Sequence, residues 1–257
     1  MQNSSDPFSL EGKNIIVSGA SSGIGRQCAW SCEAKGATVI LLGRDRNRLD
    51  QTLKGMSNIT KHLVYSLDLC DYSRVEDILR DAVAKVGKID GVINSAGIST
   101  TLPFKLVKDG NLERFFQVNV YAAINLSRLV LKTCYMSETG GSIIFISSVM
   151  AEAGEVGKSV YCMTKGALLS GSRSLAMEYA SRKIRFNCIS PGVVATPMSQ
   201  KSVYSRDDVS YKKIVELHPL GIGQTTDVAY ACIYLLSDAS KWVTGSNLVV
   251  DGGYLAH

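Results

Sequence analysis

Two side chains with acid–base chemistry stand four residues apart, Tyr161 and Lys165, in a stretch with helical spacing. Residues four apart on a helix share one face. A free phenol has a pKa near 10, and lowering it by about three units requires about 4 kcal/mol. A lysine charge about 4 Å away, at an effective dielectric of about 20, supplies that order of free energy. The pair is therefore predicted to transfer a proton, although the same spacing is also found on solvated helix faces.

Two serines end an expected strand shortly before this helix. Ser148 stands thirteen residues before Tyr161, and Ser147 precedes it directly. A hydroxyl group near the proton-transfer pair could hydrogen-bond the oxygen of a reacting carbonyl group. Ser147 is a rival for this role, and Ser148 could instead simply end the strand.

A glycine-rich turn, Ser18-Gly19-Ala20-Ser21-Ser22-Gly23-Ile24-Gly25, joins the first expected strand to a helix. Such a turn brings backbone N–H groups and the positive helix end against a pyrophosphate, and glycine removes the Cβ that would block close approach. The spacing Gly-x-x-x-Gly-x-Gly differs from the commoner Gly-x-Gly-x-x-Gly. On the first strand of an alternating α/β chain, it favours dinucleotide binding over a plain tight turn.

The end of the second expected strand, Leu41-Leu42-Gly43-Arg44, bears on the choice of dinucleotide. Enzymes that use NAD usually place Asp or Glu there, whereas enzymes that use NADP place Arg. Here Gly43 takes the carboxylate position, and the Arg44 guanidinium can bind a 2′-phosphate in a bidentate manner. NADP (as NADPH for reduction) is therefore predicted rather than NAD. The alternative is that Arg44 begins a solvated helix beside Asp45.

The elements that must position these residues alternate along the chain. Short apolar runs predict strands at 14–18, 38–42, 63–66, 91–94, 142–147, 185–190 and 247–250. Helical spacing predicts helices at 24–35, 72–86, 112–133, 159–181 and 227–237, the last with Asp227 as its N-cap. Strands that are apolar on both faces are typical of a covered parallel sheet. The predicted fold class is α/β: a single-domain Rossmann-type doubly wound parallel sheet of about seven strands with helices on both faces.

The domain organisation is predicted to be simple. Residues 1–10 form a polar N-terminal tail, and residues 11–257 form one dinucleotide-binding catalytic domain. Within it, residues 195–224 carry mixed charge and show no strand pattern. A long insertion of this kind is more often functional than random, so we expect a substrate lid there.

The composition excludes several classes of protein. A chain of 257 residues with 46% hydrophobic and 20% charged residues is too apolar for disorder. The net charge of +5 comes from scattered Lys and Arg, so no nucleic-acid partner is expected. Seven Cys and three His include no Cys-x-x-Cys pair and no ligand cluster, so no metal is expected. Without a membrane-length apolar segment or a signal-peptide pattern, a reduced cytoplasmic protein with no membrane contact is expected.

These motifs together resemble the short-chain dehydrogenase/reductase family from Leu10 to Tyr254. Asn94-Ser95-Ala96-Gly97 is similar to the family's Asn-Asn-Ala-Gly strand end, and Ser95 departs from it in a way expected to affect strand packing. The other matches are the glycines 19, 23 and 25, Asn119, Ser148, the Tyr161–Lys165 pair, Pro191-Gly192 with Thr196, and the closing Thr244-Gly245 to Asp251-Gly252-Gly253.

The resemblance implies an NADP-dependent oxidoreductase that interconverts a ketone and a secondary alcohol. It implies that Tyr161 exchanges a proton with the substrate oxygen, and that Lys165 acidifies the phenol and holds the nicotinamide ribose. It further implies that Ser148 binds the substrate oxygen and that Asn119 positions a water that returns a proton to Lys165. The predicted cofactor-binding residues are Gly19, Ser21, Ser22, Gly23, Ile24, Gly25, Arg44, Asp68, Leu69, Asn94, Ala96, Gly97, Tyr161, Lys165, Pro191, Gly192, Val194 and Thr196.

The resemblance leaves the substrate open. The overall layout is similar to the 3-oxoacyl-(acyl-carrier-protein) reductases, which makes a 3-oxoacyl thioester one candidate. The stretches 135–138 and 176–178, which would dock an acidic carrier, are not basic. Glu152 and Glu155 follow Ser148, so a sugar-like or other small polar ketone is the alternative.

Two further expectations concern catalysis and assembly. A non-catalytic NADP-binding sensor or scaffold is the alternative from another class, but such proteins commonly lose the tyrosine or lysine that this chain keeps. The family usually assembles through the regions 112–133 and 159–181 and the last strand. A homotetramer or homodimer is therefore expected.

Overall fold

The computed structural model describes residues 6–201 and 207–256, and within them one sheet of seven parallel strands. The strand order is β3-β2-β1-β4-β5-β6-β7. The chain moves outward from β1 to β3 and then returns to add β4 on the other side of β1, which makes the β1–β4 boundary the switch point of the sheet. The strands are β1 Asn14–Ser18, β2 Thr38–Gly43, β3 Leu63–Ser66, β4 Gly91–Asn94, β5 Gly141–Ile146, β6 Ile184–Pro191 and β7 Asn247–Val250.

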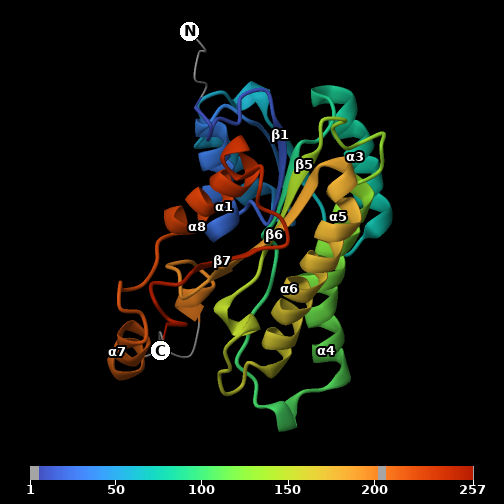
Figure 1. Ribbon diagram of the computed structural model, residues 1–257. Helices are drawn as coiled ribbons and strands as arrows, with labels where there is room; N and C mark the ends of the chain where they lie inside the picture. The colour runs from blue at the N-terminus through green and yellow to red at the C-terminus, as the bar shows by residue number, and fades with distance from the viewer. Residues whose placement is uncertain (1–5, 202–206, 257) are drawn as a thin grey trace.

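Helices cover both faces of this sheet, as Figure 1 shows. On one face lie α1 Gly23–Ala34, α2 Arg46–Lys54 and α8 Thr225–Leu236, and on the other lie α3 Tyr72–Val86, α4 Asp109–Phe116, α5 Ala122–Val130 and α6 Ser159–Tyr179. Neighbouring strand residues enter different cores: Ile16 packs with the α3–α5–α6 layer, and Val17 packs with the α1–α8 layer. This alternation buries both faces and accounts for the continuous apolar runs.

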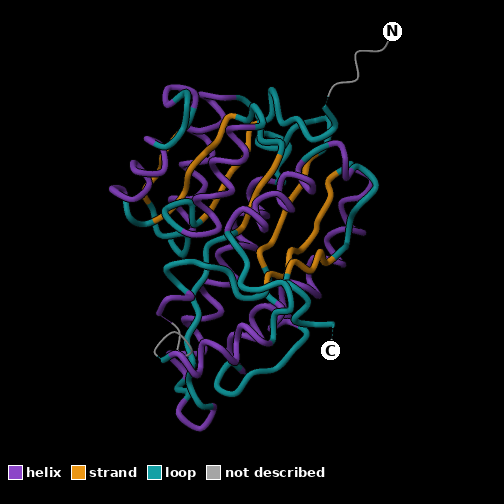
Figure 2. Tube along the Cα trace, turned by 90° about the vertical axis from the view of Figure 1, so that its left-hand side faces the viewer, coloured by secondary structure: helices purple, strands orange, loops and turns teal. Residues whose placement is uncertain are grey.

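Helices and loops extend beyond one end of the strands (Figure 2). They include α7 Asp208–Glu216, which lies within the expected lid, and α4, which precedes α5. Residues 202–206 of the expected lid and residues 1–5 of the expected N-terminal tail lie outside the described residues. From the remainder of that tail, Leu10 is fully buried against the domain.

The fold class and all seven strands are confirmed, with strand ends that differ by at most one residue. The helix expected at 112–133 is instead three segments: α4, a π-helical turn at Gln117–Tyr121, and α5. Helix α7 was not predicted, and α2 was raised only as the alternative in which Arg44 begins a solvated helix; α2 begins at Arg46 with Asp45 as its N-cap. Only Leu49 and Thr52 of α2 are buried, and α7 buries no residue, so little of either helix packs into the core.

The start of α8 corrects one prediction about a helix cap. Gln224 is the N-cap, and Asp227 is the third residue of the helix. An Asp227 carboxylate oxygen accepts a hydrogen bond from the Gln224 N–H at 2.7 Å. A carboxylate at this position reaches back over the first turn, so Asp227 supports the helix start from inside the helix.

None of the helices formed by the described residues combines the length and the apolar character that crossing a membrane requires.

The centre of one core generates a stability prediction. The Phe186 ring is fully buried, 6.3 Å from the Phe145 ring and 5.7 Å from the Tyr179 ring, measured between centroids. Phe186→Ala removes these contacts and leaves a cavity, so we expect unfolding free energy to fall by about 3–5 kcal/mol in urea titrations. Phe104→Ala is the matched control because Phe104 is 66% exposed. Equal losses in the two variants would contradict this core assignment.

Candidate active site

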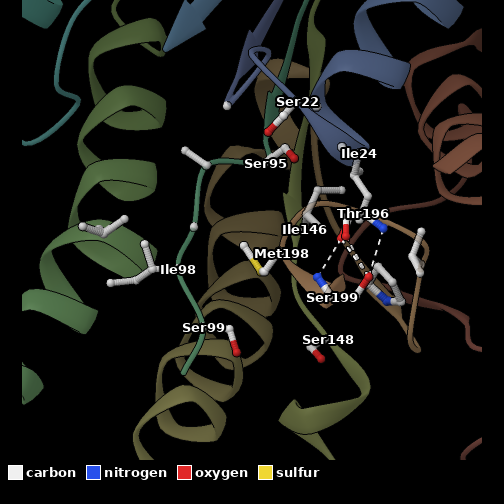
Figure 3. A pocket seen from close by; sticks show the side chains of 18 of the residues that line it. Ser22, Ile24, Ser95, Ile98, Ser99, Ile146, Ser148, Thr196, Met198 and Ser199 are labelled. Atoms are coloured by element: carbon white, nitrogen blue, oxygen red, sulfur yellow. Dashed lines mark hydrogen bonds between the residues drawn. The ribbon is translucent and has the colours of Figure 1, made fainter. Parts of the chain in front are cut away.

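A cavity of about 410 Å³ lies at the carboxyl ends of the strands. Residues that follow each of the strands β1 to β6 line it, which is where open α/β sheets bind ligands. Figure 3 shows Ser22 and Ser95 toward one end of the cavity and Ser99 and Ser148 toward the other. The cavity therefore joins the glycine turn to the region before α6.

The glycine turn is shaped by close backbone packing. Gly19 has φ of +69°, and a Cβ there would lie 2.8 Å from the Ala96 backbone nitrogen. A Cβ on Gly25 would overlap the Gly19 carbonyl oxygen. Ser18 Oγ accepts hydrogen bonds from the backbone N–H groups of Ser95 and Ala96, at 3.1 and 3.2 Å. These contacts tie the loops after β1 and β4 together and leave room for a pyrophosphate group beside the start of α1.

Two arginines line the cavity beside the glycine turn, and one of them, Arg48, pairs with Asp45 at 3.4 Å. Arg44 is exposed there, beside Ser21 and Ser22 in the lining, and Arg48 lines the same region. Gly43 also lines it, so no side-chain carboxylate stands at the end of β2. Sequence reasoning did not assign Arg48 to the site, because its proximity depends on how α2 packs beside the glycine turn.

The partly buried Arg26 side chain holds the glycine turn and α2 together. Its guanidinium donates to the Ser21 carbonyl oxygen at 2.6 Å and to Thr52 Oγ1 at 3.0 Å. Thr52 Oγ1 in turn donates to the Ala20 carbonyl oxygen at 2.9 Å. The network fixes the glycine turn to α2, which carries Arg48.

The predicted proton-transfer pair lies in the cavity wall. Lys165 is 5% exposed, and its Nζ donates to the Ile146 carbonyl oxygen at 2.7 Å. The same nitrogen lies 5.6 Å from the centre of the Tyr161 ring. Burial lowers the pKa of Lys165 from 10.5 to about 8, and the nearby Cys188 thiol acts in the opposite direction. The ammonium therefore keeps most of its charge at neutral pH.

The two serines at the end of β5 are held differently. Ser147 Oγ donates to the Lys165 carbonyl oxygen at 3.0 Å, so this hydroxyl ties the strand end to α6. Ser148 Oγ accepts from the Met150 N–H at 3.2 Å, which leaves its own hydroxyl hydrogen for another partner. Both residues line the cavity. The two hydroxyl groups therefore differ in their partners, and Ser148 is the one that the spacing predicted for the site.

The two predicted asparagines, Asn94 and Asn119, do not line the cavity. Asn119 exchanges hydrogen bonds with the Ile98 backbone, accepting from its N–H at 2.8 Å and donating to its carbonyl at 3.0 Å. It also donates to Thr164 Oγ1 at 3.1 Å. Asn94 is buried and donates to Ser127 Oγ at 3.1 Å. Neither asparagine lines the cavity, so each side chain supports the structure around it.

All the other predicted site residues line the cavity. The predicted catalytic residues found there are Ser148, Tyr161 and Lys165. The predicted cofactor-binding residues found there are Gly19, Ser21, Ser22, Gly23, Ile24, Gly25, Arg44, Asp68, Leu69, Ala96, Gly97, Tyr161, Lys165, Pro191, Gly192, Val194 and Thr196.

Sequence reasoning gave Lys158 and Ser99 no role in the site, whereas it named Glu155 together with Glu152 as signs of a polar substrate. Lys158 and Ser99 line the cavity, and the Lys158 ammonium donates to Ser99 Oγ at 3.3 Å. Glu155 also lines it, whereas Glu152 is turned toward β7 and accepts a hydrogen bond from Asn247 Nδ2 at 2.5 Å. The two glutamates that the sequence left equivalent are thereby distinguished.

The two ends of the expected lid are joined to each other by backbone hydrogen bonds. Val194 and Gly223 form a parallel bridge, with hydrogen bonds from the Ala195 N–H to Gly223 O at 2.8 Å and from the Gly223 N–H to Val193 O at 3.0 Å. Within this stretch, Thr196 and Ser199 exchange backbone and side-chain hydrogen bonds, drawn as dashed lines in Figure 3.

Comparisons with known proteins agree with this geometry. Residues 19–255 match the family model described as Enoyl-(Acyl carrier protein) reductase. The chain is 34% identical to the L-xylulose reductase of Bos taurus over 248 residues, which are 96% of this chain and 98% of the relative. It is 31% identical to the 3-oxoacyl-(acyl-carrier-protein) reductase of Thermotoga maritima over 247 residues, 95% of this chain and 98% of the relative.

A solved structure with a bound ligand is also similar. It comes from Agrobacterium tumefaciens, is provisionally described as a 2-deoxy-D-gluconate 3-dehydrogenase, and contains NADP. It superposes with a TM-score of 0.90 at 29% identity, covering 98% of this chain and 100% of that one.

The buried Lys165 ammonium predicts a pH dependence of stability. Because its pKa falls from 10.5 in the unfolded chain to about 8 in the folded protein, the unfolded chain holds more protons between these values. The destabilisation due to Lys165 is full below about pH 8 and is relieved as the pH rises toward 10.5. Relative to Lys165→Met, the wild type should gain about 1–2 kcal/mol between pH 7.5 and 9.5 in urea titrations without cofactor.

Lys54→Met is the control for this measurement, since Lys54 is an exposed residue at the end of α2. The wild type and Lys54→Met should show the same pH dependence. A difference between the wild type and Lys165→Met that stays constant with pH would contradict a buried charged amine.

Proposed function

The chain belongs to the short-chain dehydrogenase/reductase family, and from this we propose that it interconverts a small polar ketone and its secondary alcohol with NADP(H). The observation that carries the proposal is one cavity with two functional ends. Ser22 of the glycine turn lies at one end and Ser148 lies toward the other, and Tyr161 and the buried Lys165 line the same cavity. An oxidoreductase of this kind needs a dinucleotide and a proton donor in the same space.

The protein's own residues would handle the proton and the substrate oxygen. When bound, the dinucleotide supplies the hydride that becomes the new C–H bond of the alcohol. Tyr161 gives its phenolic proton to the carbonyl oxygen, which completes the new O–H bond, and takes that proton back in the oxidative direction. Ser148 donates a hydrogen bond to the same oxygen and aligns it toward Tyr161.

Lys165 and Asn119 would support this transfer in different ways. The Lys165 charge stabilises the phenolate left on Tyr161, and the hydrogen bond to Ile146 O holds the ammonium in place. The Asn119 side chain already uses both amide hydrogens. We therefore assign that side chain a positioning role, which fixes Ile98 and α6, and the orientation of a water by Asn119 stays a prediction.

The arginines beside the glycine turn support NADP over NAD. Arg44, Arg48 and Ser21 line the region beside the glycine turn, and the end of β2 offers no carboxylate to a ribose hydroxyl. Two guanidinium groups suit a 2′-phosphate. The bound NADP in the Agrobacterium tumefaciens structure supports the same choice.

The substrate end supports a polar ketone. Ser99, Glu155 and Lys158 bring three polar side chains to the part of the wall that includes Tyr161. The similarity to L-xylulose reductase supports a sugar-like substrate. A 3-oxoacyl thioester is the second candidate, supported by the Thermotoga maritima relative and by Met150, Met198 and Ile214 in the lining.

Three further features belong to the proposal. The stretch 195–224 would act as a substrate lid, because its ends are bridged and Ile214 of α7 lines the cavity. A homotetramer or homodimer is supported by exposed apolar side chains on α6, such as Met163 and Met177.

A reduced, cytoplasmic setting is supported by seven free thiols.

Tyr161→Phe tests the proposed chemistry. The change removes the transferable proton and keeps the ring, so we expect turnover to fall by about 100-fold or more while NADPH affinity stays nearly constant. NADPH consumption with L-xylulose, D-erythrulose and a short 3-oxoacyl thioester would be followed for the wild type and the variant. A variant with wild-type rates would exclude Tyr161 as the proton donor, and a non-catalytic sensor would show no turnover in either protein.

Arg44→Asp tests the cofactor assignment. Loss of the guanidinium and gain of a carboxylate should lower the ratio of kcat/KM for NADPH to that for NADH by about tenfold to a hundredfold. Arg46→Asp makes the same charge change at an exposed residue that pairs with Asp50 and does not line the cavity. Similar ratios in both variants would refute a specific contact with the 2′-phosphate.

A further inference from the structure

A lysine ammonium with a single protein partner lies in the wall near Tyr161. Lys158 is 6% exposed, and its Nζ has one hydrogen-bond acceptor, Ser99 Oγ at 3.3 Å. Throughout residues 6–201 and 207–256, no Asp or Glu oxygen lies within 4.0 Å of this nitrogen. An ammonium has three N–H donors, so two of them have no acceptor among the described residues.

This arrangement is costly for the protein alone. Lysine is almost never fully buried unless it is paired, because a desolvated charge loses its hydration. Burial lowers the pKa of Lys158, and the charge of Glu155 partly opposes this shift. A ligand that supplies an anionic oxygen to the free donors would replace the missing hydration.

The backbone around Lys158 favours an anion as well. Lys158 is the N-cap of α6, a helix of 21 residues with no acidic residue in its first turn and no side-chain cap. The N-terminus of a long helix carries a partial positive charge and unpaired N–H groups. The ammonium and the helix end therefore act in the same direction.

The position of Lys158 determines how far an anionic group of the substrate would lie from the ketone that reaches Tyr161. Lys158 and Tyr161 lie at the first turn of α6, while Ser99 comes from the loop after β4, and all three line one cavity. A substrate whose ketone reaches Tyr161 would extend its remaining groups along this wall. Glu155 lies in the same lining and can accept hydrogen bonds from substrate hydroxyl groups.

We propose that Lys158, with Ser99, binds a carboxylate of the substrate, so that the protein acts on hydroxylated oxo acids and their alcohols. One ammonium matches one carboxylate charge, and the neighbouring Glu155 disfavours a doubly charged phosphate. This inference rests on the proposed function and names the substrate class of that site. The carboxylate is bound and left unchanged, while the ketone elsewhere in the molecule is reduced.

Binding of matched compounds tests the carboxylate site without requiring turnover. D-Gluconate and D-glucitol differ only in a carboxylate against a hydroxymethyl group, and the same holds for shorter aldonates of four and five carbons and their alditols. Calorimetric titration of the NADP-loaded protein should give a Kd at least about tenfold lower for an aldonate than for its alditol. Lys158→Gln should remove that difference, and Lys54→Gln, at an exposed position on α2, should keep it.

Two results would overturn the inference. Equal affinity of the wild type for each aldonate and its alditol would exclude a carboxylate site, and so would a preference that survives in Lys158→Gln. Failure of the proposed function gives a separate result. In that case no ketone, charged or neutral, supports NADPH consumption, whatever the calorimetry shows.

Discussion

A lysine ammonium buried beside a tyrosine ring is the interaction on which the rest of the site depends. A charge in this position requires a fixed acceptor and close packing, since it has lost most of its water. The Ile146 carbonyl oxygen at the end of β5 is that acceptor. Ser147 ties the Lys165 backbone to the same strand end, and Gly97 packs beside the ammonium, where an added Cβ would be in ordinary contact with Nζ at 3.7 Å. The end of the sheet thus sets where α6 can lie and where Tyr161 is presented.

The switch point of the sheet provides the second half of the arrangement. Because β1 and β4 are neighbours in space, the glycine turn meets the loop that begins at Ser95, and Ser18 holds the two together. The same β4 loop continues through Ile98, which Asn119 holds, to Ser99 beside Lys158. One loop therefore runs from the dinucleotide end to the substrate end. Its course explains how a buried asparagine can matter to the site without facing the cavity.

Sequence reasoning succeeded where local signals were strong. Apolar runs defined the strands, and the glycine turn, Arg44, Ser148, Tyr161 and Lys165 all line one cavity. It missed α7, which buries nothing, and the π-helical turn at Gln117–Tyr121, which leaves no periodic pattern. It gave Lys158 no role, because the features that make this residue unusual are its burial and its hydrogen bond to Ser99, which stands on a loop 59 residues away.

The ionisation of Tyr161 tests the central claim most directly. Tyrosinate absorbance would be followed from pH 6 to 11 for the wild type and for Tyr161→Phe, and their difference isolates this one tyrosine. The experiment would be repeated in the Lys165→Met background. If the buried ammonium stabilises the phenolate, Tyr161 ionises below the ordinary phenol value near 10, and this shift is lost without Lys165. Ionisation at an ordinary pH in both backgrounds would contradict the account.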